Sequence, residues 1–179
     1  MNKIRIASHS LHILFKVLCW LLPIVLAYFT FFHLDSMIQN GMFNSMVPSS
    51  KIHSTHFSLI HRAIVSAIYV FSTSITIIVF YQLSKLFHLY ERGLLFELET
   101  IRVIRNISIF MIANALFQML CQPLMTTALT YNNPVGQRFV SITLSSSDFT
   151  TLLIAFIILV ASWIVKEAYQ LKAEARLTI

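Results

Sequence analysis

Charged residues are scarce in this chain. Asp, Glu, Lys and Arg make up 11% of its residues, against about 25% in ordinary soluble domains, while 57% are hydrophobic. This composition excludes a soluble globular protein. Four apolar spans of about 20 residues each would leave only short loops in 179 residues. We therefore expect a single four-helix membrane domain over residues 1–179, with no separate soluble domain.

Cysteine is also rare. Cys19 and Cys121 fall in different expected spans, at depths that differ by about 10 Å for a rise of 1.5 Å per helical residue. That separation is too large for a disulfide without distortion. We expect each thiol to act as a small buried apolar side chain, with a redox role as the alternative.

Sequence motifs of the common catalytic sites are missing. The chain has no G-x-S-x-G, no H-E-x-x-H and no phosphate-binding loop, and its seven acidic residues lie at or outside the ends of the apolar stretches. An intramembrane hydrolase needs a nucleophile and a base at compatible depth. We therefore expect no enzymatic activity, no catalytic residue and no cofactor.

Three histidines follow an H-x2-H-x4-H pattern in the first outer connection. The spacing of His53, His56 and His61 could bring imidazoles to a divalent metal outside the membrane. No neighbouring Cys, Asp or Glu adds a ligand. We expect solvated loop histidines and no metal site, and metal binding or proton sensing remains the alternative.

What the chain does have is a set of four long apolar stretches. They predict an all-α, polytopic membrane protein with transmembrane helices at about residues 13–34, 62–83, 107–129 and 149–165. Residues 33–58 and 131–148 are rich in Asn, Gly, Pro and Ser, which favours loops. In the second loop a short β-prone stretch is formed by Phe139, Val140, Ile142 and Leu144.

The cations predict the orientation. Ten of the thirteen Lys and Arg residues lie before residue 17, in the connector 84–106 or in the tail 166–179, and three lie in the other connections. Because Lys and Arg mark the cytoplasmic side, we expect both termini inside the cell, in a bacterial inner membrane. The net charge of +6 is dispersed at helix ends, which favours lipid headgroups over nucleic acid as the partner.

The connector is charged on one side and apolar on the other. Gly93 is expected to end the second helix, after which apolar residues recur with Arg102 and Arg105 opposite them. Glu99 and Arg102 are spaced for an ion pair between residues i and i+3. This pattern indicates an amphipathic segment at the membrane interface that binds lipid headgroups, and the alternative is a docking surface for a cytoplasmic protein.

Polar side chains also occur inside two of the expected spans. Asn114, Gln118 and Gln122 recur every four residues and so share one helical face, followed by Pro123. Amides at membrane depth must face protein or water, and we expect hydrogen bonds between helices, with a ligand or partner contact as the alternative. In the second span small hydroxyl residues predict close helix packing; they are Ser66, Ser72, Thr73, Ser74 and Thr76.

The C-terminal half resembles a bacterial membrane family known as domain of unknown function 2975. The resemblance rests on the G-x-x-F of residues 93–96, the following TIRVIRNIS, and the ending from ITLSSSDF to EARLTI. The family's tail commonly reads EG-x-x-L-x-x-E-x-x-L-T-V, and the matching residues here are Glu167, Leu171, Glu174, Leu177 and Thr178. Ala168 replaces the usual glycine and Ile179 the valine.

The resemblance implies a four-span protein without established catalytic residues, often found beside small helix-turn-helix regulators. We therefore expect a protein that acts by interaction, as a sensor or anchor for a transcriptional regulator, and that could form homo-oligomers. The candidate interaction residues are Gly93, Phe96, Arg102, Arg105, Glu167, Leu171 and Glu174. The alternative is a small transporter, or an accessory subunit of one, that uses Asn114, Gln118 and Gln122 as a polar intramembrane site.

Overall fold

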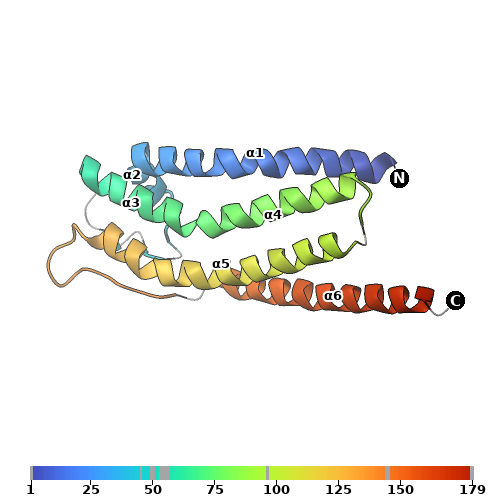
Figure 1. Ribbon diagram of the computed structural model, residues 1–179. Helices are drawn as coiled ribbons and strands as arrows, with labels where there is room; N and C mark the ends of the chain where they lie inside the picture. Colours follow the sequence, from blue (N-terminus) through green and yellow to red (C-terminus); the bar gives the residue numbers. More distant parts are fainter. Residues whose placement is uncertain are drawn as a thin grey trace. The chain divides into compact units, whose positions relative to one another are not determined.

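The computed structural model describes residues 2–44, 46–48, 51–52, 57–95, 97–143 and 146–177. Within these residues the chain forms helices joined by turns and contains no strand, so the predicted all-α class is confirmed. The helices, shown in Figure 1, are α1 (Asn2–Phe32), α2 (Leu34–Gln39), α3 (Leu59–Ser72), α4 (Ser74–Glu91), α5 (Leu98–Thr130) and α6 (Ser146–Leu177).

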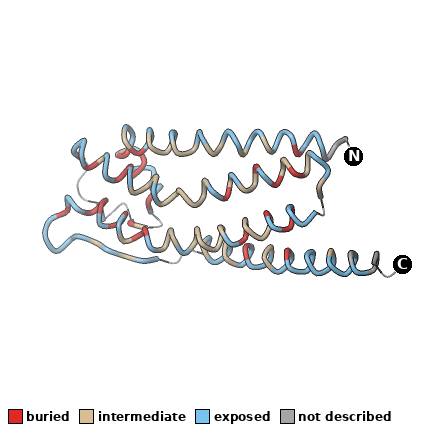
Figure 2. Tube along the Cα trace, viewed as in Figure 1, coloured by how far each residue is buried: buried red, intermediate tan, exposed pale blue. Residues whose placement is uncertain are grey.

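Four stretches of helix in the described residues are long and apolar enough to cross a membrane, as the sequence predicted. They are Arg5–Phe32, Leu59–Glu91, Leu98–Thr130 and Ser147–Lys172. Their apolar side chains are largely exposed, and Figure 2 shows long exposed stretches along α1 and α6. Exposed apolar surface of this extent suits contact with lipid rather than with water.

The chain divides into two compact units. Unit 1 consists of Met1–Trp20, Ile75–Asn114 and Thr150–Ile179, and unit 2 of Leu21–Ser74 and Ala115–Phe149. The boundary between the units therefore falls within α1, α5 and α6, and each of these helices contributes one part to unit 1 and the other part to unit 2. Unit 1 contains both termini and the α4–α5 connection, whereas unit 2 contains the α1–α3 and α5–α6 connections.

In unit 1, α4 runs antiparallel to the segments of α1 and α5 that pack on it. Between α4 and α5, Lys85 contacts Glu99 and Thr76 contacts Asn114, so residue numbers rise on one helix as they fall on the other. Five buried apolar side chains form the core of this pair: Val79, Leu86, Leu89, Val103 and Ile107. The same end of unit 1 carries both termini and the α4–α5 connection (Figure 1).

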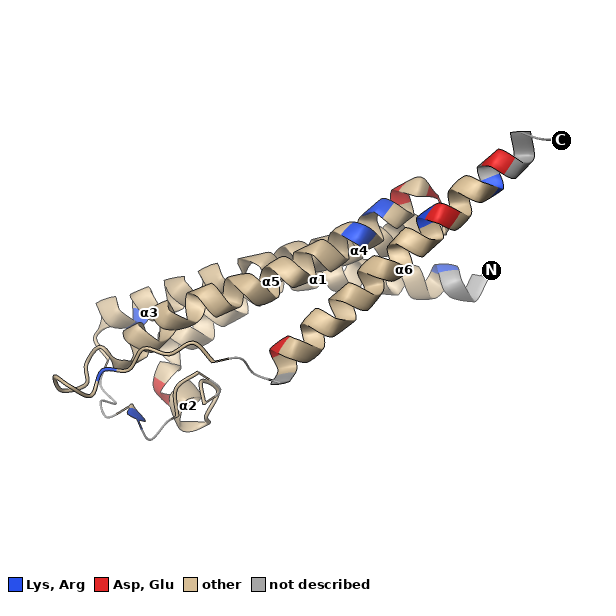
Figure 3. Cartoon of the chain, turned by 90° about the horizontal axis from the view of Figure 1, so that it is seen from below, with Lys and Arg blue, Asp and Glu red and all other residues tan. Residues whose placement is uncertain are grey.

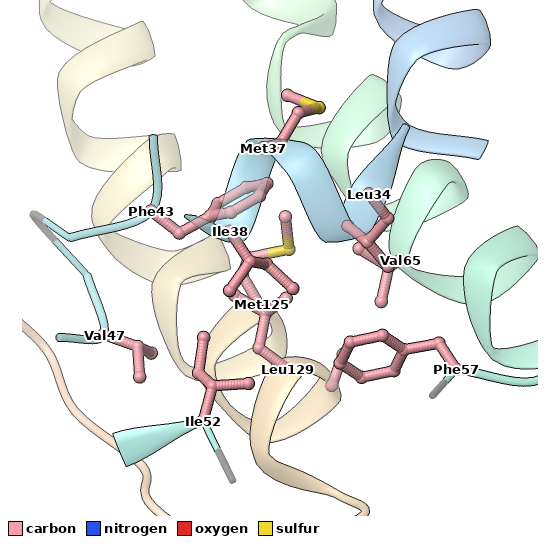
Figure 4. Packing of buried hydrophobic residues seen from close by; sticks show 11 residues of the cluster. Leu34, Met37, Ile38, Phe43, Val47, Ile52, Phe57, Val65, Met125 and Leu129 are labelled. Atoms are coloured by element: carbon pink, nitrogen blue, oxygen red, sulfur yellow. The ribbon is translucent and has the colours of Figure 1, made fainter. Parts of the chain in front are cut away.

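Unit 2 has the larger apolar core, part of which comes from a segment expected to be a loop. Residues 34–39 form the short helix α2, whose Leu34, Met37 and Ile38 are buried. They pack with Phe43, Val47, Ile52, Phe57 and Val65 and with Met125, Ala128 and Leu129 of α5 (Figure 4). The loop interpretation of residues 34–39 was therefore wrong, because burial of three side chains stabilises a helix too short to persist alone.

The second predicted span is interrupted at Thr73, between α3 and α4. The hydroxyls of Ser72 and Thr73 both donate to the carbonyl oxygen of Tyr69, at 2.9 and 3.1 Å. Such bonds compete with the regular helical pattern. A third hydroxyl, on Ser66 of α3, accepts a hydrogen bond from Thr30 of α1 at 2.9 Å, so the expected close packing through small hydroxyl residues occurs in unit 2.

The β-prone stretch does not form a strand where the structure describes it. The amide N–H of Phe139 donates to the hydroxyl oxygen of Thr130 at 3.1 Å, and that hydroxyl group also contacts the carbonyl oxygen of Phe139 at 3.1 Å. Ser141 donates through its hydroxyl to the carbonyl of Met46 at 3.2 Å. Side chains and loop carbonyls thus take the place of a partner strand, and Leu144 lies outside the described residues.

Both cysteines are free. Cys121 is buried, as predicted, and Cys19 is half-buried with its thiol 3.7 Å from the carbonyl oxygen of Ile77.

Candidate functional site

Helix α4 ends in a glycine cap that positions the α4–α5 connection. The amide N–H of Leu94 donates to the carbonyl of Leu89 at 3.1 Å, and that of Gly93 donates to Tyr90 at 3.0 Å. Gly93 has a φ of 81°, so this is a Schellman motif with glycine in the left-handed conformation. Leu94 packs onto the core that contains Leu89, and its carbonyl accepts a hydrogen bond from Thr100 at 2.5 Å. The chain is thereby turned directly into α5.

An ion pair joins α4 to α5 just beyond this turn. The Nζ of Lys85 lies 3.1 Å from Oε1 of Glu99. Glu99 and Arg102, which are spaced for an ion pair, form none within the described part of the chain. The spacing within α5 places Arg102 near Glu99, but Lys85 of the neighbouring helix α4 binds the Glu99 carboxylate instead.

The two arginines of the connector differ in environment. Arg102 is exposed, and no ion pair to it occurs within the described part of the chain. Arg105 is half-buried, and its Nε is a buried atom without a hydrogen-bond partner among the described residues. Phe96, the remaining candidate of the connector, lies outside the described residues.

The C-terminal helix continues beyond its apolar stretch as an exposed helix. Glu167, Leu171 and Glu174 are all exposed, and Leu171 keeps 60% of its surface accessible. Figure 3 shows the charged residues of unit 1 near the two termini and the α4–α5 connection. The two candidate interaction segments, residues 93–106 and 166–179, therefore belong to the same unit.

A cluster of histidines that the sequence reasoning missed lies between α1 and α4. His9 Nδ1 is 3.0 Å from Oε1 of Glu91, and the rings of His12 and His88 have centroids 5.0 Å apart. His12 Nδ1 donates to the carbonyl of Ser84 at 2.9 Å. The sequence pattern that could have revealed this cluster is the spacing of its members. His9 and His12 are at positions i and i+3, as are His88 and Glu91, and this spacing places each pair on one face of a helix.

The outer histidines do not behave as one motif. His53 and His56 lie outside the described residues, and His61, predicted to be solvated, is buried in the first turn of α3. The hydroxyl of Ser58 caps this helix by accepting from the amide N–H of His61 at 3.3 Å. No group of three His, Cys, Asp or Glu residues suited to a metal ion occurs among the described residues.

The three amides have separate surroundings. In unit 1, Asn114 accepts a hydrogen bond from the hydroxyl of Thr76 at 3.1 Å. In unit 2, the buried Gln122 accepts from the backbone N–H of Thr143 at 2.7 Å and from its hydroxyl at 3.3 Å. Gln118 and Gln122 line a cavity of about 10 Å³, which has room for about one water molecule.

A family model described as protein of unknown function (DUF2975) matches residues 45–179, well over half of the chain. The matched region contains the α4–α5 connection, the tail and three of the four stretches able to cross a membrane. No curated protein and no solved structure matches the chain. Together with its four membrane-compatible helices, this match shows that the chain belongs to the DUF2975 family, as the resemblance of its C-terminal half predicted.

Proposed function

We propose that this protein is a multi-pass inner-membrane protein of a bacterium that acts by interaction, holding or signalling to a cytoplasmic regulatory protein. The partner would contact residues 93–106 and 166–179. The observation that carries the proposal is the tail of α6, which stays helical to Leu177 and exposes Leu171 beside charged residues. An exposed leucine on a charged helix is what a partner with an apolar groove recognises.

The charge distribution supports a cytoplasmic position for this surface. Ten of the thirteen Lys and Arg residues belong to unit 1, and only Lys51, Arg62 and Arg138 belong to unit 2. Of these three, Arg62 pairs with Asp35 at 2.6 Å, and Lys51 lies over the ring of Phe139. Since Lys and Arg accumulate on the cytoplasmic side, both termini and the α4–α5 connection would lie inside the cell.

Site-specific photocrosslinking in living cells tests the proposal. A photoreactive amino acid at Leu171 or Arg102 is expected to capture the same protein, while one at Val135, 94% exposed in unit 2, captures none. Leu171→Glu, which keeps the helix but removes the apolar contact, should abolish capture from position 102 as well. Crosslinks from positions 171 and 102 that contain only lipid or this protein itself would contradict the proposal.

The transporter alternative stays a prediction. Asn114 and Gln122 already have protein partners, and the cavity beside Gln118 is too small for a solute larger than water. Homo-oligomer formation also stays a prediction, since the exposed apolar sides of α1 and α6 suit either lipid or a second copy.

A further inference from the structure

A cavity of about 370 Å³ lies between α4 and α5 in unit 1. It is lined by Tyr81, Gln82 and Lys85 from α4 and by Glu99, Arg102, Val103 and Asn106 from α5. Small-molecule sites usually measure about 300–1,000 Å³, so this cavity can hold a small polar group.

The charges of the lining favour an anion. Lys85 and Arg102 supply two cations and Glu99 one carboxylate. The carboxylate is held by Lys85 at 3.1 Å, while Arg102 has no ion pair within the described part of the chain. The lining thus carries two cations and one carboxylate, and the exposed guanidinium of Arg102 is the cation that forms no ion pair within the described residues.

The donors present suit phosphate in particular. A guanidinium presents a planar fork of N–H groups that matches two phosphate oxygens, and such charge-assisted hydrogen bonds are the strong ones. Lys85, Asn106 and Gln82 add further N–H donors from both helices. Tyr81 and Val103 are the aromatic and aliphatic members of the lining.

We propose that the cavity between α4 and α5 binds a phosphate group, with Arg102 as its main contact and Lys85 and Asn106 as supporting donors. The phosphate can belong to the headgroup of an anionic phospholipid or to free inorganic phosphate, since both present the same oxygens. Four of the lining residues fall within residues 93–106, which the proposed partner would contact, but Leu171 and the rest of the tail do not line the cavity. Phosphate binding to the purified protein therefore does not require the regulatory partner.

Native mass spectrometry of the detergent-purified full-length protein tests this proposal. Three ligands are added in separate arms: phosphatidylglycerol, diacylglycerol as its phosphate-free counterpart, and inorganic phosphate. Arg102→Gln should lower the affinity for the phosphate-bearing ligand about tenfold, the loss expected for one charge-assisted contact. Arg102→Lys should lose less, because it keeps the charge but not the fork. Glu99→Gln should raise the affinity, because it removes a negative charge from the lining.

The matched control is Arg92→Gln. Arg92 lies in the same connection, is exposed and does not line the cavity, so its loss should change the affinity less than twofold. A response confined to phosphatidylglycerol identifies a lipid headgroup, and one confined to inorganic phosphate identifies the free anion. The proposal would be overturned if Arg102→Gln bound the phosphate-bearing ligand as tightly as the unaltered protein, or if Arg102→Gln and Arg92→Gln lost affinity equally. Binding of diacylglycerol as tight as that of phosphatidylglycerol would also overturn it.

Discussion

The Nε2 of His61, on α3, lies 2.7 Å from the carbonyl oxygen of Ala128, on α5. A carbonyl oxygen only accepts, so this nitrogen carries the hydrogen and is not available to a metal ion. The imidazole also stacks on Phe57, with ring centroids 4.9 Å apart. His61 therefore ties two helices of unit 2 together and acts as part of the core.

Replacing His61 should destabilise the protein. His61→Ala removes a buried hydrogen bond and the ring contact with Phe57, and we expect a loss of about 2 kcal/mol in the free energy of unfolding. Denaturant titration in detergent measures it. Gln39→Ala, at an exposed position of α2, is the control and should be neutral. A stability of His61→Ala equal to that of the control would show that the contact does not stabilise unit 2.

Substituting Gly93 should weaken the turn between α4 and α5 through the backbone alone. A Cβ at this position would meet no atom within 4 Å, so the cost is that of a side chain at a φ of 81°, about 1 kcal/mol for alanine. Asparagine tolerates this conformation better, and Gly93→Asn should lose less than Gly93→Ala. Thermal unfolding in detergent compares them, and the opposite order would argue against the cap.

The amides of α5 should differ in their importance for stability. Gln122→Leu removes the acceptor for the backbone N–H of Thr143 and should cost about 1 kcal/mol. Gln118→Leu, on the same helix face, should cost less, because the Gln118 side chain makes no hydrogen bond to any residue in the described part of the chain. Melting temperatures of the two variants provide the measurement. If both variants keep the wild-type melting temperature but change a transport phenotype, the transporter alternative gains support.

The contact between His9 and Glu91 should stabilise the packing of α1 on α4. His9 Nδ1 lies 3.0 Å from Oε1 of Glu91, and a hydrogen bond to a carboxylate is stronger than one between neutral groups. A double-mutant cycle of His9→Gln and Glu91→Gln, followed by melting temperature, should therefore show that the two losses are not additive. Strictly additive losses would show that this contact does not stabilise unit 1.

The orientation can be checked at both ends of the molecule. Green fluorescent protein fused after residue 179 should fluoresce, because we expect the C-terminus in the cytoplasm. A cysteine at Val135, whose surface is 94% exposed, should react with an impermeant maleimide added to intact cells. The same cysteine at Leu171 should react only after the cells are opened. Labelling of position 171 in intact cells would reverse the orientation and remove the basis for a cytoplasmic partner.

Local patterns predicted much of the fold because their causes are local. Gly93 ends α4 because no other residue adopts its φ as easily, and the apolar stretches form helices that satisfy their own backbone groups. Helix α2 and the ion pair from Lys85 to Glu99 were missed. The first depends on burial against α5 and the second on a neighbouring helix, and neither cause is visible in a short stretch of sequence.

The amino-acid sequence by itself determined the class of this protein: four apolar helices, few charges, most cations beside the termini and the α4–α5 connection, and a tail typical of its family. The length of an apolar stretch and the positions of Lys and Arg are properties of the linear sequence, so the sequence is sufficient to predict the spans and their orientation. Only the tertiary structure decided which polar groups meet. It buried His61, gathered His9, His88 and Glu91, and left Arg102 facing a cavity, because such contacts depend on how separate helices pack.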